Sequence, residues 1–200
     1  MLTKLLIMPI FIMLACSAQA ARFNAGEDYK ILNLPSTQAP TVTEFFSFYC
    51  LHCYKNQGLM TELKKQIPKN AIFQKNHVSF MGGNIGKATI KAYATLVILN
   101  IEDSMVPVIF NRIHLLQKPP RTEDEVRQIF IDEGIDGDQF DEVYNSFATN
   151  AMANRFDKAF QDSGLSGVPA VIVNGKYHVT PETLKSKEDY FALINFLLTQ

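Results

Sequence analysis

Strand signals lie only toward the two ends of this 200-residue chain, and a long helical stretch separates them. The clearest strand is 41–48, Thr-Val-Thr-Glu-Phe-Phe-Ser-Phe, which is dense in β-branched and aromatic residues. In chain order, strands are expected at 29–32, 41–48, 71–80, 170–173 and 176–179. Between the last two, Asn174-Gly175 is typical of a two-residue hairpin turn. This distribution predicts an α/β fold, a mixed sheet flanked by helices with an all-helical insertion.

The stretch 85–164 shows helical spacing of apolar residues and no convincing strand. One helix carries Ile90, Tyr93, Ala94 and Val97, and a second is expected after Pro107. Thr122-Glu-Asp-Glu125 is a capping box that starts a third. Further helices are expected at 138–147, 151–162 and 187–198. The predicted division is a signal peptide at 1–20, a sheet-containing domain at 21–84 and 165–200, and the helical insertion at 85–164.

Two cysteines three positions apart, Cys50 and Cys53, open a predicted helix at 50–66. Unpaired backbone amides and the positive end of the helix dipole gather there, so a thiolate at Cys50 is stabilised and its pKa falls. Cys53 lies one turn further, where it can form a disulfide with Cys50 or attack a mixed disulfide formed there. His52 can donate hydrogen bonds or positive charge to the Cys50 sulfur. Because a stabilised thiolate makes the disulfide a stronger oxidant, we predict a redox-active pair that gives its disulfide away.

Two other uses of these cysteines stay open. Together with His52 they could form half of a zinc site, but structural zinc needs four ligands, and the other histidines are dispersed along the chain at His77, His114 and His178. They could also form a plain structural disulfide, although a two-residue gap on a helix strains the bond. We therefore predict no metal site and no bound cofactor.

Three further positions fit thiol–disulfide chemistry. Glu44 is an acid within an apolar strand; if buried, its pKa rises and it can relay protons to or from Cys53, whereas on an edge strand it would face water. Lys75 either pairs with Glu44 or is solvated. Val168-Pro169 precedes an apolar strand, so Pro169 either forms a cis peptide bond that leaves the backbone of Val168 free to pair with substrate, or is an ordinary loop proline. His77 is expected to be a core or surface histidine rather than a ligand.

Residues 1–20 have the pattern of a secretory signal: a basic Lys4, an apolar run at 5–14 and the cleavage site Ala18-Gln19-Ala20. The run is shorter than the ~20 apolar residues of a membrane span. A lipoprotein signal ending at Cys16 is the alternative. Export leaves two of the three cysteines in the mature chain, too few for a stabilising disulfide framework. The net charge of −1 gives no sign of a nucleic-acid partner, and we expect a periplasmic monomer.

Three segments resemble the DsbA family of periplasmic disulfide oxidases: 44–54 (Glu-Phe-Phe-Ser-Phe-Tyr-Cys-Leu-His-Cys-Tyr), 77–83 (His-Val-Ser-Phe-Met-Gly-Gly) and 167–177 (Gly-Val-Pro-Ala-Val-Ile-Val-Asn-Gly-Lys-Tyr). The resemblance implies a thioredoxin-like fold with a helical domain inserted after the second segment. It also implies a cis-Pro169 facing the active site, beside an apolar groove that accepts unfolded polypeptide.

The same resemblance implies an activity and its residues. Members donate their disulfide to reduced exported polypeptides and are reoxidised by the quinone-linked inner-membrane protein DsbB. Cys50 would be the nucleophile, Cys53 the resolving cysteine and Glu44 the buried acid. A disulfide reductase or isomerase, and a peptide-binding chaperone-like module, are the alternative functions.

Two positions depart from the family pattern. Leu51 stands where the family usually has proline, which suits the first helical position, and Gln57 stands where an acid is common in close relatives. The first change is expected to soften the start of the helix and the second to remove a charge near the site. Both bear on the redox potential and on contact with DsbB.

Overall fold

The computed structural model describes residues 22–200, so the predicted signal peptide and Cys16 lie outside the described residues. Its sheet contains five strands in the order β1-β5-β4-β2-β3. Their bounds are β1 (Tyr29–Ile31), β2 (Thr41–Phe46), β3 (Ile72–His77), β4 (Ala170–Val173) and β5 (Tyr177–Val179). Strands β2 and β3 are parallel, and the other neighbouring pairs are antiparallel. The predicted mixed sheet is therefore confirmed.

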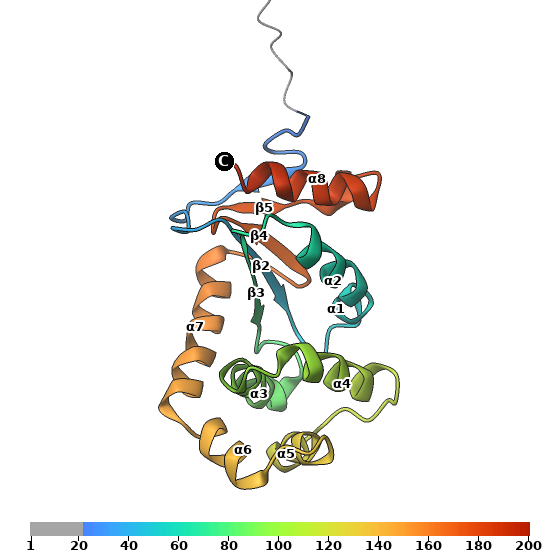
Figure 1. Cartoon of the computed structure of the whole chain (residues 1–200), viewed down its shortest axis with the longest axis vertical. Helices are drawn as coiled ribbons and strands as arrows, with labels where there is room; N and C mark the ends of the chain where they lie inside the picture. The colour runs from blue at the N-terminus through green and yellow to red at the C-terminus, as the bar shows by residue number, and fades with distance from the viewer. Residues whose placement is uncertain (1–21) are drawn as a thin grey trace, which may run out of the picture.

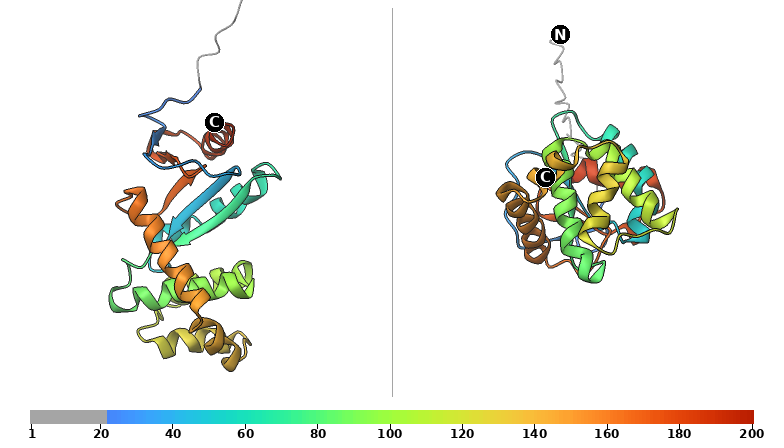
Figure 2. Two further views of the ribbon diagram at one scale, coloured as in Figure 1. Left: turned by 90° about the vertical axis from the view of Figure 1, so that its left-hand side faces the viewer. Right: turned by 90° about the horizontal axis from the view of Figure 1, so that it is seen from below.

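Eight α-helices surround this sheet in the described part of the chain. They are α1 (Leu51–Lys55), α2 (Gln57–Gln66), α3 (Gly86–Leu99), α4 (Glu102–His114), α5 (Glu123–Asp132), α6 (Gly137–Tyr144), α7 (Phe147–Ser163) and α8 (Lys187–Leu197). Helices α3 to α6 gather beyond one end of the sheet, and the long α7 runs from this helical block back along the sheet (Figures 1 and 2). No helix among residues 22–200 is long and apolar enough to cross a bilayer.

Side chains that alternate along the strands build two different cores. Val171 and Val173 of β4 belong to the core that includes Leu63 of α2 and Leu193 of α8, whereas Ile172 packs on the other face, toward Phe160 of α7. Successive residues of a strand point to opposite faces, so β4 needs apolar residues at every position. All six residues of β2 are buried for the same reason, because β2 lies between β3 and β4.

A third core joins the helical block to the end of β2. It contains Phe46 and Phe48 together with Tyr93 of α3 and Phe110 of α4, and both Cys50 and Cys53 belong to it. The ring of Phe46 meets that of Tyr93 edge-on at 5.0 Å. The two cysteines thus lie where the sheet, α1 and the helical block meet.

The predicted elements are present, but several of their ends differ, and β2 and α6 end at Phe46 and Tyr144 rather than at 48 and 147. Residues 50–66 were expected to form one helix, but they form α1 and α2, which meet at Asn56. Strand β3 ends at His77 rather than at 80, and α7 starts at Phe147 because Ser146 caps it through the backbone N–H of Thr149. Helix α4 starts at Glu102 rather than after Pro107: the carbonyl that Pro107 leaves unpaired belongs to Asp103, which is exposed to water.

Two local predictions about turns and caps are confirmed. Asn174 and Gly175 have φ of 51° and 69°, as a two-residue hairpin with two left-handed residues requires. Thr122 caps α5 by accepting the backbone N–H of Glu125. In the return bond of this cap, the backbone N–H of Arg121, one residue before the expected donor, donates to the Glu125 carboxylate.

Candidate active site

Cys50 and Cys53 are both buried free thiols at the start of α1. Cys50 is the N-cap residue, with an extended backbone at φ −88° and ψ 110°, and its Sγ accepts the backbone N–H of Cys53 at 3.1 Å. The sulfur therefore occupies the position that a serine or aspartate oxygen takes in an ordinary helix cap. A negative charge on this sulfur is placed where the helix favours an anion.

The two thiols have opposite pKa shifts. The hydrogen bond from the Cys53 side chain, with the backbone N–H groups of Cys53 and His52, lowers the pKa of Cys50 to about 7 against the effect of burial and of the Glu44 carboxylate. The side-chain hydrogen bond with Cys50 and burial raise the pKa of Cys53 above its ordinary range. Near neutral pH the first thiol is therefore poised to ionise while the second keeps its proton.

Val168, which precedes Pro169, lies against the Cys50 sulfur. The Val168–Pro169 peptide bond is cis, as the resemblance implied, and Sγ of Cys50 lies 3.5 Å from the carbonyl oxygen of Val168. Val168 and Pro169 line a groove of about 860 Å³, and Glu44 also lines it. The lining mixes apolar side chains such as Leu59, Met60 and Leu165 with the charged Lys30, Glu182 and Lys187.

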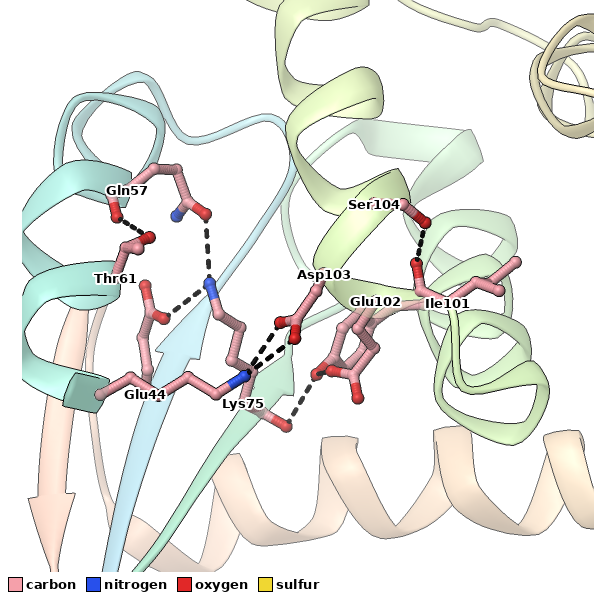
Figure 3. A network of polar contacts seen from close by, with 10 residues as sticks. Glu44, Gln57, Thr61, Lys75, Ile101, Glu102, Asp103 and Ser104 are labelled. Carbon is pink, nitrogen blue, oxygen red and sulfur yellow. Dashed lines mark hydrogen bonds and ion pairs between the residues drawn. The ribbon is translucent and has the colours of Figure 1, made fainter. Parts of the chain in front are cut away.

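Glu44 is buried on the interior strand β2, with 1% of its surface exposed, so it is not an edge residue facing water. Burial raises its pKa, and the Lys75 ammonium, 3.0 Å from Oε2, offsets part of the rise. Lys75 lies opposite Glu44 on β3 and also donates to Oε1 of Gln57 at 3.1 Å. Gln57 in turn donates through Nε2 to the carbonyl oxygen of Cys53 at 3.1 Å. Figure 3 shows Lys75 between the Glu44 carboxylate and the Gln57 amide.

The side chains between the two cysteines face outward. His52 is exposed, and within residues 22–200 no hydrogen bond joins its imidazole to a cysteine sulfur; its backbone N–H contributes instead to the low pKa of Cys50. Leu51 is 49% exposed. Both side chains are therefore open to a partner that approaches Cys50.

The structure adds two histidines to the site that were not predicted to belong there. His77, expected in the core or on the surface, is fully buried at the end of β3, where Nε2 accepts the backbone N–H of Phe48 at 3.0 Å. His114 ends α4, and its Nε2 lies 2.8 Å from the carbonyl oxygen of Phe48. Neither contact has a local sequence signal, because each joins segments far apart in the chain. Within the described part of the chain, no three His, Cys, Asp or Glu side chains cluster to hold a metal ion.

A thioredoxin-like sheet, a low-pKa cysteine that caps a helix and a proline loop against its sulfur define a thiol–disulfide oxidoreductase. The family model described as "DSBA-like thioredoxin domain" matches residues 41–187. The chain therefore belongs to the DsbA family, as the resemblance predicted.

Named relatives and solved structures agree with this placement. The thiol:disulfide interchange protein DsbA of Escherichia coli K12 is 38% identical over 174 residues, which cover 86% of this chain and 83% of the relative. The DsbA of Pectobacterium carotovorum is 36% identical and covers 96% of each chain. Among solved structures, Proteus mirabilis DsbA with the non-covalently bound peptide PWATCDS has a TM-score of 0.83 at 31% identity, covering 90% of this chain and all of that one.

Proposed function

We propose that this enzyme is an oxidase, which donates the Cys50–Cys53 disulfide to reduced exported polypeptides. The observation that supports this direction is the set of hydrogen bonds to the Cys50 sulfur, from the Cys53 side chain and from the backbone N–H groups at the start of α1, which stabilise the thiolate of the reduced form. A reduced form stabilised in this way makes the disulfide a stronger oxidant than one whose first thiol keeps its ordinary pKa. The peptide bound to the Proteus mirabilis relative supports a polypeptide as the substrate class.

The reaction proceeds in two exchanges. A substrate thiolate attacks Sγ of Cys50, the bond to Cys53 breaks, and Cys53 leaves with the electron pair. Because the pKa of Cys53 is raised, its sulfur takes up a proton, and the buried Glu44 carboxyl is the group assigned to supply it. A second substrate thiolate then attacks the substrate sulfur of the mixed disulfide, and Cys50 leaves as a thiolate. The substrate gains a disulfide, and the enzyme holds the two electrons as a dithiol.

The remaining assignments concern the surroundings of the pair. Val168 offers its backbone to an extended substrate, Pro169 shapes the loop and the adjoining groove takes the flanking chain. His52 presents its backbone N–H and an exposed ring beside Cys50. Cys53 resolves mixed disulfides that do not proceed, by attacking the Cys50 sulfur and releasing the substrate thiol.

Reoxidation needs an external acceptor for two electrons. A quinone-linked inner-membrane protein of the DsbB type fits this need, and a signal peptide at 1–20 would deliver the enzyme to the periplasm where both partners are found. Membrane vesicles with DsbB and quinone should reoxidise the dithiol with matching quinone reduction. A mature protein starting at Ala21 is expected by mass spectrometry; a lipid on Cys16 contradicts the plain signal.

The direction is tested by the equilibrium with glutathione and by titration of the thiolate. We expect a potential well above the roughly −270 mV of thioredoxin and a Cys50 pKa below that of a free thiol. A potential near that of thioredoxin with an ordinary thiol pKa contradicts the oxidase. With a reduced unfolded polypeptide and oxidised glutathione, Cys53→Ser should accumulate a mixed disulfide at Cys50, and Cys50→Ser should form no disulfide with substrate at that position.

A further inference from the structure

The peptide groups of Phe48, two residues before Cys50, are held by two imidazoles from different parts of the molecule. On one side His77 of β3 accepts the Phe48 N–H at 3.0 Å. On the other side Nε2 of His114, at the end of α4, lies 2.8 Å from the Phe48 carbonyl oxygen, so it donates to that oxygen. One contact comes from the sheet and the other from the helical block.

His77 is suited to a fixed role. It is wholly buried among aromatic rings, with the ring of Phe46 at 5.0 Å and that of Phe48 at 4.9 Å. Burial lowers its pKa to about 3, so the ring is neutral under physiological conditions. Because Nε2 accepts, the proton lies on Nδ1, which has no hydrogen-bond partner among residues 22–200. Burying an imidazole whose Nδ1–H has no partner costs free energy. The neutral ring that results accepts the Phe48 N–H and holds it in one position.

His114 also connects the helical block to α1, the helix that carries Cys53. Its ring stacks on that of Tyr54 in α1, with centroids 5.0 Å apart and planes 14° apart. The Tyr54 hydroxyl in turn donates to Oδ1 of Asn111, one turn earlier in α4. Figure 1 shows the end of α4 beneath α1. The end of α4 therefore holds both the segment before Cys50 and the helix after it.

From this arrangement we infer that His114 is a positioning residue for the Cys50 sulfur, and that with His77 it couples the helical block to the redox pair. The inference rests on the proposed function of Cys50 as the reacting thiol. It does not depend on whether the pair works as an oxidant or a reductant.

A short covalent path carries the effect. Phe48 is followed by a tight turn in which the Cys50 N–H bonds to the Ser47 carbonyl at 3.0 Å. This turn directs Cys50 so that its Sγ meets the Cys53 N–H at 3.1 Å. Release of the Phe48 carbonyl loosens the turn and weakens the capping bond, so the thiolate of the reduced form loses part of its stabilisation.

The experiment compares three variants of the mature protein. His114→Leu removes the donor, His114→Gln keeps an N–H donor of similar reach, and Arg112→Gln breaks the ion pair with Asp132 of α5 without touching Phe48. His114→Leu should raise the Cys50 pKa and shift the equilibrium with glutathione about fivefold toward the disulfide, which is the effect of partly weakening one hydrogen bond to a charged sulfur. His114→Gln should restore most of both values, and Arg112→Gln should leave them unchanged.

Equal values in His114→Leu and in the unmodified protein overturn the inference, and so does an equal shift in His114→Leu and His114→Gln. Urea unfolding of each variant separates a local effect on Cys50 from a general loss of stability. Arg112→Gln serves as the control for a general loss of stability caused by a change in α4. Should His114→Leu not fold, His114→Asn replaces it, because its shorter amide does not reach Phe48. Failure of the oxidase assignment appears in the unmodified protein, whereas failure of the inference appears only in the differences between variants.

Discussion

Gln57 lies where an added negative charge would change the pKa of Cys50. Its amide links the Cys53 carbonyl to Lys75, and Lys75 has Glu44 as its carboxylate partner there. Gln57→Glu adds a negative charge near both thiols, as Glu44 already does. We expect a higher Cys50 pKa and about threefold less thiolate at neutral pH, measured by thiolate absorbance.

The control for this change is Thr61→Glu, which adds the same charge one turn further along α2 on an exposed residue. Screening by water should make its effect much smaller. A Cys50 pKa that is equal in both variants, or lower in Gln57→Glu, contradicts the electrostatic account.

Glu44 is expected to lower the stability of the protein at neutral pH. Its folded pKa is raised from 4.5 because the ionised form is buried, so the folded state binds its proton more tightly than the unfolded state. Stability then falls as the pH rises from 4.5 through the folded pKa. Glu44→Gln removes this cost while its amide oxygen still faces Lys75. We expect the free energy of unfolding at pH 7 to rise by on the order of 1 kcal/mol, measured with urea.

The same variant makes a kinetic prediction. Without the buried acid, protonation of Cys53 should slow, and the rate of thiol exchange should lose its dependence on the Glu44 pKa. Unchanged stability together with an unchanged pH–rate profile contradicts both roles of Glu44.

At the scale of elements, the start of α1 can be stiffened without loss of a hydrogen bond. The low pKa of Cys50 depends on the Cys53 side chain and on the N–H groups of Cys53 and His52, so Leu51 can give up its own N–H. Cys50 already has the extended backbone that a following proline requires. Leu51→Pro should therefore stabilise the reduced form by about 0.4–1 kcal/mol, seen in thermal unfolding. Leu51→Ala controls for the lost leucine side chain, and a less stable proline variant contradicts the prediction.

Element types followed from the sequence better than element ends did. The hairpin at Asn174-Gly175 and the cap at Thr122 are set by local backbone chemistry, so local patterns predicted them. The break at Asn56 and the early start of α4 depend on packing and on which carbonyls face water, which periodicity does not report. The domain boundaries at 84 and 164 stay predictions.

At the scale of the whole molecule, the buried His77 should make the fold sensitive to acid. Its pKa is about 3 when folded and 6.5 ordinarily, so the unfolded state binds one proton more within this window. The free energy of unfolding should therefore fall with decreasing pH, at up to about 1.4 kcal/mol per pH unit from this one group. His77→Gln keeps an acceptor for the Phe48 N–H and should flatten the slope. An unchanged slope in urea unfolding between pH 6 and 4 contradicts this.

The redox state of the two cysteines should change the stability of the whole protein in the neutral to alkaline pH range. The folded pKa of Cys50 is lowered to about 7 from 9.0, so the stabilisation of the dithiol form is complete above 9.0 and is lost as the pH falls through 7. We expect the reduced protein to unfold at a higher temperature than the oxidised protein, with a gap that widens from pH 7 toward pH 9. Scanning calorimetry of both forms measures this, and a gap that narrows with pH contradicts the bound thiolate.

The sequence by itself determined the chemistry and the class of fold. Two cysteines one turn apart at a helix start, an acid in a buried strand and a Val-Pro pair before another strand are local patterns, and their physical consequences follow from the residues alone. Only the tertiary structure decided what surrounds them. Strand register and the packing of α4 place Gln57 between Cys53 and Lys75 and bring two imidazoles to Phe48. Such contacts join segments that are far apart in the sequence, so no local pattern predicts them.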